Sequence, residues 1–120
     1  MIKRKSAMRR EATEHMRAGE GVIVNDHILE KNEMRTNCRL FTRMTIEPGA
    51  SIGYHKHAKE EDIYYILSGI ATVCDNGETK AVYPGEVVYT GDGDSHSIAN
   101  NGTEPLELID VILTYEPFER

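Results

Sequence analysis

Short apolar segments separated by glycine and proline turns constrain the fold of this chain more than any other feature. These segments are rich in β-branched residues, and they span residues 22–29, 39–46, 50–57, 63–67, 70–74, 87–90, 96–99 and 106–115. Segments of this length and composition, bounded by turn residues, are typical of β-strands. The pattern predicts an all-β sandwich or barrel.

The turn signals sharpen this prediction. The Pro-Gly pairs at 48–49 and 84–85 suit type II turns, because proline presets φ at the first central position and glycine accepts a positive φ at the second. The Asn-Gly pairs at 76–77 and 101–102 predict tight hairpins of type I′. Helical periodicity is nearly absent, and only residues 6–17 are expected to form one short helix.

The length of the chain sets its domain organisation. A chain of 120 residues has room for one domain of ordinary size, and we predict a single domain over 1–120. Within it we expect an N-terminal arm over residues 1–20 and a barrel core over residues 38–115. No apolar run approaches the roughly 18 residues of a spanning helix, and no apolar segment follows the basic N-terminus. We therefore expect no membrane partner and a cytoplasmic location.

The charge of the chain argues against nucleic acid as a partner. The formal net charge of −6 opposes binding to nucleic acid, whose phosphates need a basic face.

The cysteines, Cys38 and Cys74, are too few for a disulfide framework and have no partner at metal-finger spacing. We expect both to be buried or half-buried thiols.

Three histidines point to a metal centre. His55 and His57 are two residues apart on a predicted strand, so their side chains share one face about 6.6 Å apart. Both rings can then reach one ion, at about 2.0–2.1 Å if the ion is zinc. Acidic residues follow at 60–62, and His96 begins a later strand. Three imidazoles and one carboxylate suit a single zinc, manganese, iron or nickel ion.

Two longer motifs resemble a known family. Residues 49–69 resemble the first motif of the cupin superfamily: G, five residues, H-x-H, three or four residues, E, six residues, G, with Asp62 at the glutamate position. Residues 85–100 resemble the second motif, G, five residues, P-x-G, two residues, H, three residues, N, except that Gly91 stands where the family has proline. The resemblance implies a jelly-roll (double-stranded β-helix) barrel with the metal inside, and a homodimer.

The resemblance also implies the ligands, but it leaves the carboxylate open. Carried over residue by residue, the family's ligands fall on His55, His57, Asp62 and His96. Asp62 is one methylene shorter than the family's glutamate. Glu61 has a longer reach but faces the other side of the strand, whereas Glu60 has the same parity as Asp62 but is expected in the loop. We favour Asp62, with Glu60 or Glu61 as the alternative.

Strand parity predicts the residues around the ion. Tyr64 and Ile66 share the parity of Asp62, and Ile98 shares that of His96, so these three are expected to face the interior and line a substrate pocket. The Tyr64 hydroxyl is expected either to bind substrate or to be satisfied within the core. His15, in the expected helix, and His27, on the outer face of a strand, are expected to have no role.

Arginines would complete a site for a dicarboxylate. Arg39 and Arg43 are the natural clamps, but Leu40, Met44 and Ile46 occupy the apolar parity of their strand. This parity places both arginines on the opposite face, which weakens the case for a decarboxylase, because such an enzyme would need a fixed cation opposite the second carboxylate.

Two functions are compatible with these residues. The first is a metal-dependent enzyme (a decarboxylase, dioxygenase or isomerase) acting on a small oxygen-rich anion, either an organic acid or a sugar derivative. The resemblance is greatest to small single-domain cupins described as oxalate-decarboxylase-like or sugar-isomerase-like, which implies the substrate class only loosely. The second is a non-catalytic cupin that binds or senses a small molecule and keeps its metal for structure.

Overall fold

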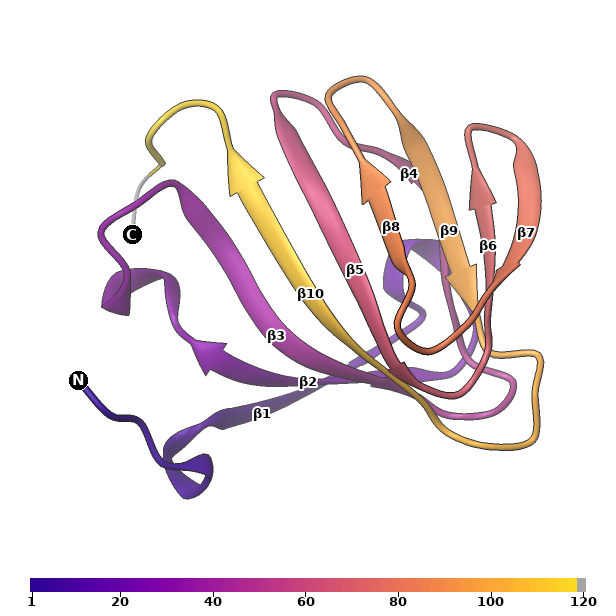
Figure 1. Ribbon diagram of the computed structural model, residues 1–120, viewed down its shortest axis with the longest axis horizontal. Coiled ribbons are helices and arrows are strands. Elements are labelled where there is room, and N and C mark those ends of the chain that lie inside the picture. The colour runs from indigo at the N-terminus through magenta and orange to yellow at the C-terminus, as the bar shows by residue number, and fades with distance from the viewer. Residues whose placement is uncertain (119–120) are drawn as a thin grey trace.

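Two antiparallel sheets form the molecule. The computed structural model describes residues 1–118, and within them ten strands form a six-stranded sheet, in the order β1-β2-β3-β10-β5-β8, and a four-stranded sheet, in the order β4-β9-β6-β7 (Figure 1). The strands are β1 (Arg9–Glu14), β2 (Val22–Leu29), β3 (Cys38–Ile46), β4 (Ser51–Lys56), β5 (Glu60–Ser68), β6 (Ala71–Asp75), β7 (Glu78–Val82), β8 (Val87–Thr90), β9 (Ser95–Ala99) and β10 (Leu106–Thr114). This arrangement confirms the predicted all-β, jelly-roll class. No helix among these residues is long and apolar enough to cross a membrane.

The predicted strands are confirmed to within a few residues, but the prediction of a helix over residues 6–17 is wrong. The segment contains only short 3-10 turns, η1 (Lys5–Ala7) and η2 (Met16–Ala18), on either side of β1. β1 pairs along its whole length with β2, and the side chain of Arg10 forms two hydrogen bonds with Asp26 across the pair. Pairing with a neighbouring strand therefore overrides a weak local pattern. A third short turn, η3 (Lys31–Glu33), precedes β3.

The turn predictions succeed at three of the four pairs. Gly49 and Gly85 have φ values of 88° and 86°, and Asn76 and Gly77 both have the positive φ that a type I′ hairpin requires. The predicted hairpin at 101–102 is wrong. The Asn100 side chain organises this loop instead, since its Nδ2 donates to the carbonyl oxygens of Ile46 and Glu104, and its Oδ1 accepts from the Gly102 N–H.

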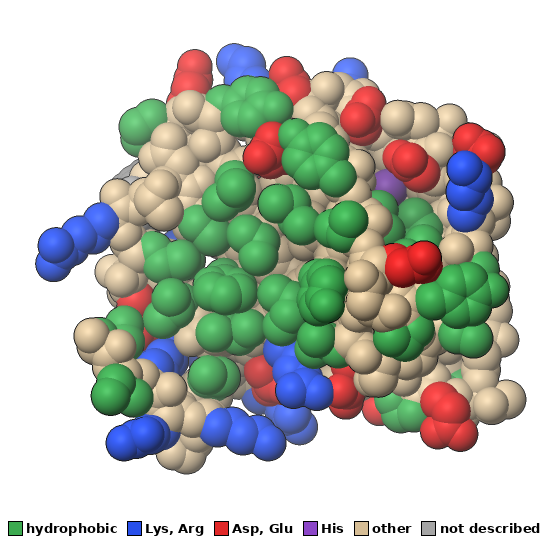
Figure 2. Space-filling view, in the orientation of Figure 1, with side chains coloured by type: hydrophobic (Ala, Val, Ile, Leu, Met, Phe, Trp, Pro, Cys, Tyr) green, Lys and Arg blue, Asp and Glu red, His purple; other side chains and the backbone are tan. Residues whose placement is uncertain are grey.

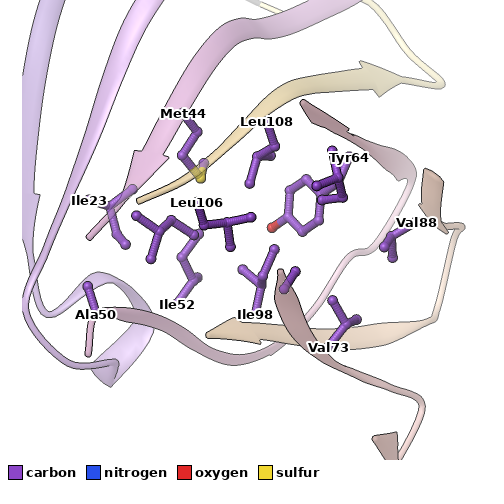
Figure 3. Close-up of a cluster of buried hydrophobic side chains, with 13 residues drawn as sticks. Ile23, Met44, Ala50, Ile52, Tyr64, Val73, Val88, Ile98, Leu106 and Leu108 are labelled. Atoms are coloured by element: carbon purple, nitrogen blue, oxygen red, sulfur yellow. The ribbon is translucent and has the colours of Figure 1, made fainter. Parts of the chain in front are cut away.

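The hydrophobic core lies between the two sheets (Figure 3). Core side chains occupy every second position along the strands, as Leu106 and Leu108 do on β10, where both are fully buried. The acid at the next inward position of β10, Asp110, is also buried. The inner face is therefore apolar at one end and polar at the other, and the polar end holds the histidines.

Gly53 lies on β4 between the core residue Ile52 and His55 at the polar end. A Cβ at Gly53 would lie 1.9 Å from the carbonyl oxygen of Arg17, because η2 crosses β4 at this point. We expect Gly53→Ala to lower the free energy of unfolding by about 1–3 kcal/mol, the usual range for an overpacked contact. Thermal or denaturant unfolding measures the loss.

Gly77→Ala is the matched control for this substitution. Gly77 has a φ of 86°, but its Cβ would meet nothing within 4 Å. The control therefore measures backbone strain alone, about 1 kcal/mol. A loss of stability in Gly53→Ala no larger than that in Gly77→Ala would contradict the steric argument.

Candidate metal centre

Three strands bring four potential ligands together. His55 lies on β4 opposite His96 of β9, and Asp62 lies near the start of β5. His57 directly follows β4, where its N–H donates to the Asp94 carbonyl oxygen and its own carbonyl oxygen accepts from the Gly93 N–H. One nitrogen from each histidine and one carboxylate oxygen of Asp62 all lie within 4.8 Å of one another.

The three histidine rings point their Nε2 atoms at one another. The Nε2 atoms of His55 and His57 are 3.1 Å apart, those of His57 and His96 are 3.0 Å apart, and those of His96 and His55 are 3.1 Å apart. Asp62 Oδ2 lies 3.3 Å from His57 Nε2 and 3.4 Å from His96 Nε2. His55 is half-buried and the other three residues are buried. The group is therefore compact, and it borders solvent at His55.

The opposite nitrogen of each ring has its own hydrogen-bond partner. An Nδ1–H that donates to such a partner leaves the Nε2 lone pair free for a metal, which is how proteins commonly orient a histidine ligand. The partners are the Gly53 carbonyl oxygen for His55 (2.7 Å), Glu60 Oε2 for His57 (2.5 Å) and Thr90 Oγ1 for His96 (2.8 Å).

This arrangement fits a divalent metal ion. With the protons on Nδ1, three Nε2 lone pairs converge and no proton lies between them. Asp62 Oδ1 is also buried without a hydrogen-bond partner. Converging lone pairs and a buried carboxylate need a cation to offset their repulsion and the loss of hydration. Three imidazoles and one carboxylate are a donor set that first-row divalent metals accept.

Burial and neighbouring carboxyl groups control ionisation at the centre. Burial opposes ionisation of Asp62, but the hydrogen bond from Asp110 and the adjacent imidazole rings of His57 and His96 outweigh it and hold the pKa of Asp62 well below its usual value. Burial and the adjacent Asp62 carboxylate raise the pKa of Asp110 well above its usual value. Asp110 therefore keeps its proton and can donate a hydrogen bond to Asp62. Asp62 stays ionised, as a metal ligand must.

Known proteins resemble this chain over nearly its whole length. A Thermotoga maritima protein named oxalate-binding protein is 42% identical over 113 residues, which cover 94% of this chain and 93% of that protein. The crystal structure of a "predicted oxalate decarboxylase" from Thermotoga maritima is also 42% identical, with a TM-score of 0.89, and the match covers 95% of this chain and 99% of that one.

A more distant structure agrees on the fold. A Klebsiella pneumoniae protein with a double-stranded β-helix domain has a TM-score of 0.68 at 24% identity, covering 85% of each chain. The family model for the cupin domain matches residues 42–112. The chain belongs to the cupin superfamily.

The three adjacent acids of this cupin have separate surroundings. Asp62 faces the histidines, whereas Glu61 accepts a hydrogen bond from the Tyr89 hydroxyl (2.5 Å). Glu60 is the first residue of β5 rather than a loop residue, and its carboxylate contacts Nδ1 of His57. The structure therefore groups Asp62 with the histidines and places Glu60 behind His57.

Arg39 does not lie where strand parity predicts. Along β3 and β10, Ile112 pairs with Leu40 but Leu113 pairs with Cys38, so Arg39 is an extra, bulged residue. Its guanidinium reaches Glu60 with two hydrogen bonds of 2.8 Å. A bulge redirects side chains, which is why the prediction of an outward Arg39 is wrong.

The prediction for Arg43, which lies on the same strand beyond the bulge, is confirmed. Arg43 is exposed and pairs with Glu107 on the neighbouring strand β10. Parity therefore holds along β3 wherever the register is regular.

The two histidines outside the motifs are also placed differently from the prediction. His27 is buried rather than on the outer face, and its Nε2 lies 3.0 Å from Glu11 Oε1. His15 is not helical, since its φ of 50° is left-handed and its Nδ1 lies 3.1 Å from the Gly19 carbonyl oxygen. Both differences follow from the β1–β2 hairpin, which local sequence patterns do not indicate.

The predicted pocket residues lie beneath the histidines. Ile66 and Ile98 are fully buried in the core, and their contact with a substrate stays a prediction. The Tyr64 ring stacks on His96 with 5.0 Å between ring centroids and 9° between ring planes (Figure 3 shows Tyr64 inside the core). Burial raises the pKa of Tyr64 well above its usual value, so its hydroxyl keeps its proton.

Sequence reasoning missed Thr90 and Asp110. Thr90 is a strand residue that local sequence does not connect with His96. Asp110 had a detectable signal, because it is the one acid at an inward position of β10, between Leu108 and Ile112. A buried acid in an apolar row needs a partner, and Asp62 lies beside it.

Proposed function

We propose that this cupin holds one divalent metal ion at His55, His57, Asp62 and His96 and is a metal-dependent enzyme for a small oxygen-rich anion, with a dicarboxylate such as oxalate as the first candidate. The observation that carries the proposal is the convergence of three Nε2 atoms whose Nδ1 partners leave the lone pairs free. The 42% identity to the Thermotoga maritima oxalate-binding protein supports the ligand class.

The charge of the centre favours an anion. A divalent ion with three neutral imidazoles and one carboxylate has a local charge of about +1. This positive charge would lie next to a bound ligand, so it attracts an anion there although the net charge of the whole chain is −6. The half-buried His55 leaves one side of the group accessible to a ligand.

The roles of the protein residues follow from their contacts. The bound ion would polarise an oxygen of the ligand as a Lewis acid. Thr90, Glu60 and the Gly53 carbonyl hold the three rings in place, and Tyr64 packs against the flat face of His96. Manganese, iron, zinc and nickel all suit these donors.

One observation favours the second candidate, a binding or sensing cupin without catalysis. Among residues 1–118, the acids that touch the cluster from outside already have partners: Glu60 is bound by Arg39, and Asp110 lies against Asp62. Neither is free to act as a general acid or base on a ligand.

The test measures metal and ligand together. Protein purified without added metal is analysed for its elements, and oxalate, formate and acetate are then titrated calorimetrically into metal-loaded and chelated samples. We expect about one ion per chain and binding of oxalate only to the loaded protein. Consumption of oxalate would support the enzyme, and unchanged oxalate would support the binding protein. The absence of metal after reconstitution would contradict both.

We also propose a homodimer formed by the outer face of the six-stranded sheet. Tyr65, Val87 and Tyr89 are 46%, 60% and 53% exposed, and Tyr65 pairs with Val87 across β5 and β8. Figure 2 shows hydrophobic side chains gathered over this face. Soluble monomers rarely expose large contiguous apolar patches, and the accessible surface of 7010 Å² exceeds the roughly 6,500 Å² expected for a monomer of this mass.

Charge reversal on this face tests the dimer. We expect Val87→Glu to convert the protein to a monomer in sedimentation or light scattering, because an isologous interface places the new charge against its symmetry mate. Ile70→Glu is the matched control, since Ile70 is 50% exposed in the β5–β6 turn. A monomeric wild-type protein, or a Val87→Glu protein that stays dimeric, would contradict the proposal.

A further inference from the structure

Glu60 is a second acid that contacts one of the candidate metal ligands. It lies two residues from Asp62 on the same face of β5, has one more methylene, and already touches His57 through Oε2 at 2.5 Å. Its longer side chain makes Glu60 a candidate second carboxylate ligand. The contacts that hold its carboxylate behind His57 therefore bear on which acid binds the metal.

The main such contact is the fork of Arg39. Nε of Arg39 donates to Glu60 Oε1, and Nη2 donates to Glu60 Oε2, each at 2.8 Å. A bidentate arginine occupies both carboxylate oxygens in a fixed plane. The Glu60 side chain is 14% exposed, so solvent screens the pair only partly.

The bulge in β3 is what makes this contact. Arg39 has no partner in the β3–β10 register, whereas Leu40 and Cys38 on either side of it do. Arg43, on the same strand without a bulge, points outward to Glu107. Of these two arginines, the one at the register shift, Arg39, is therefore the one that contacts Glu60.

We propose that Arg39 is a positioning residue that holds Glu60 on Nδ1 of His57 and off the metal, so that Asp62 is the only carboxylate ligand. This inference rests on the metal centre proposed above. Its consequence is electrostatic: a second carboxylate on a divalent ion would cancel the remaining positive charge of about +1. Arg39 thereby preserves the charge that attracts an anionic ligand.

The experiment asks whether Glu60 can replace Asp62 once Arg39 is removed. Affinity for Co²⁺ is measured by competition with a chromophoric chelator, and the visible spectrum of bound Co²⁺ reports its coordination. We expect Asp62→Asn to weaken binding about tenfold or more. Adding Arg39→Gln should recover about fivefold of this loss and change the spectrum, and adding Glu60→Gln as well should cancel the recovery.

Arg43→Gln in the Asp62→Asn background is the matched control, because Arg43 lies on the same strand and pairs with Glu107 instead. Equal Co²⁺ affinity of the Arg39→Gln and Arg43→Gln double variants, at unchanged melting temperatures, would overturn the inference. If the Arg39→Gln variants are unfolded, Arg39→Lys, which keeps the charge but loses the fork, replaces them with the same expected recovery. Failure of the wild-type protein to bind Co²⁺ would instead overturn the proposed metal centre.

Discussion

His96→Ala is expected to reduce bound metal from about one ion per chain to almost none. His96 supplies one corner of the Nε2 triangle and lies 3.0 Å from His57 and 3.1 Å from His55. It is fully buried, so the truncated side chain leaves a cavity with no ligand atom at this corner of the triangle. Loss of one of four ligands should weaken binding by at least the roughly 10–100-fold seen for outer-shell partners. Elemental analysis after dialysis measures the result.

The fold should survive this substitution. Truncating a buried ring that stacks on Tyr64 leaves a cavity, which costs about 2–4 kcal/mol. His96→Gln keeps more volume and is the companion variant, with the same expected loss of metal. His15→Ala is the matched control, because His15 is exposed and outside the cluster, and it should retain full metal. Normal metal content in both His96 variants would contradict the ligand assignment.

Asp110→Asn is expected to stabilise the metal-free protein at neutral pH by up to about 4 kcal/mol, because keeping Asp110 protonated costs about 1.4 kcal/mol for each pH unit above the unfolded pKa. The raised pKa of Asp110 means that the folded state binds its proton more tightly than the unfolded state, whose value is near 3.8. Stability of the wild-type protein therefore falls as pH rises from about 4 toward the raised pKa. Asparagine is never ionised and can still donate to Asp62.

The pH dependence distinguishes this explanation from a packing effect. Unfolding is followed in chelator between pH 4 and 8, and the gain from Asp110→Asn should be small near pH 4 and largest at the upper end. The Asp62 contribution has the opposite sign, because its lowered pKa makes that stabilisation disappear only as pH falls below about 4. Asp110→Ala, which lacks the donor and leaves a cavity, should destabilise. A gain in Asp110→Asn that is constant with pH would contradict the argument.

The structure shows where local patterns suffice. β2 and β8 match the predicted ranges residue for residue, because short segments rich in β-branched residues between turn signals favour a strand. β1 and β7 were missed, since both are polar and exposed and are held by pairing with β2 and β6 rather than by their own composition. Such strands have no local signal, because their stability resides in the neighbouring strand.

The sequence by itself predicted an all-β sandwich or barrel, because short apolar segments and turn residues act over short distances. Its resemblance to the two cupin motifs added the jelly-roll class and brought His55, His57, Asp62 and His96 into one hypothesis. Only the tertiary structure decided the surroundings of these side chains. The bulge at Arg39, the hydrogen bond from His96 to Thr90 and the position of Asp110 beside Asp62 all depend on how β3, β5, β8, β9 and β10 meet. A one-residue change of register reverses the face of a side chain, and no local pattern reports it.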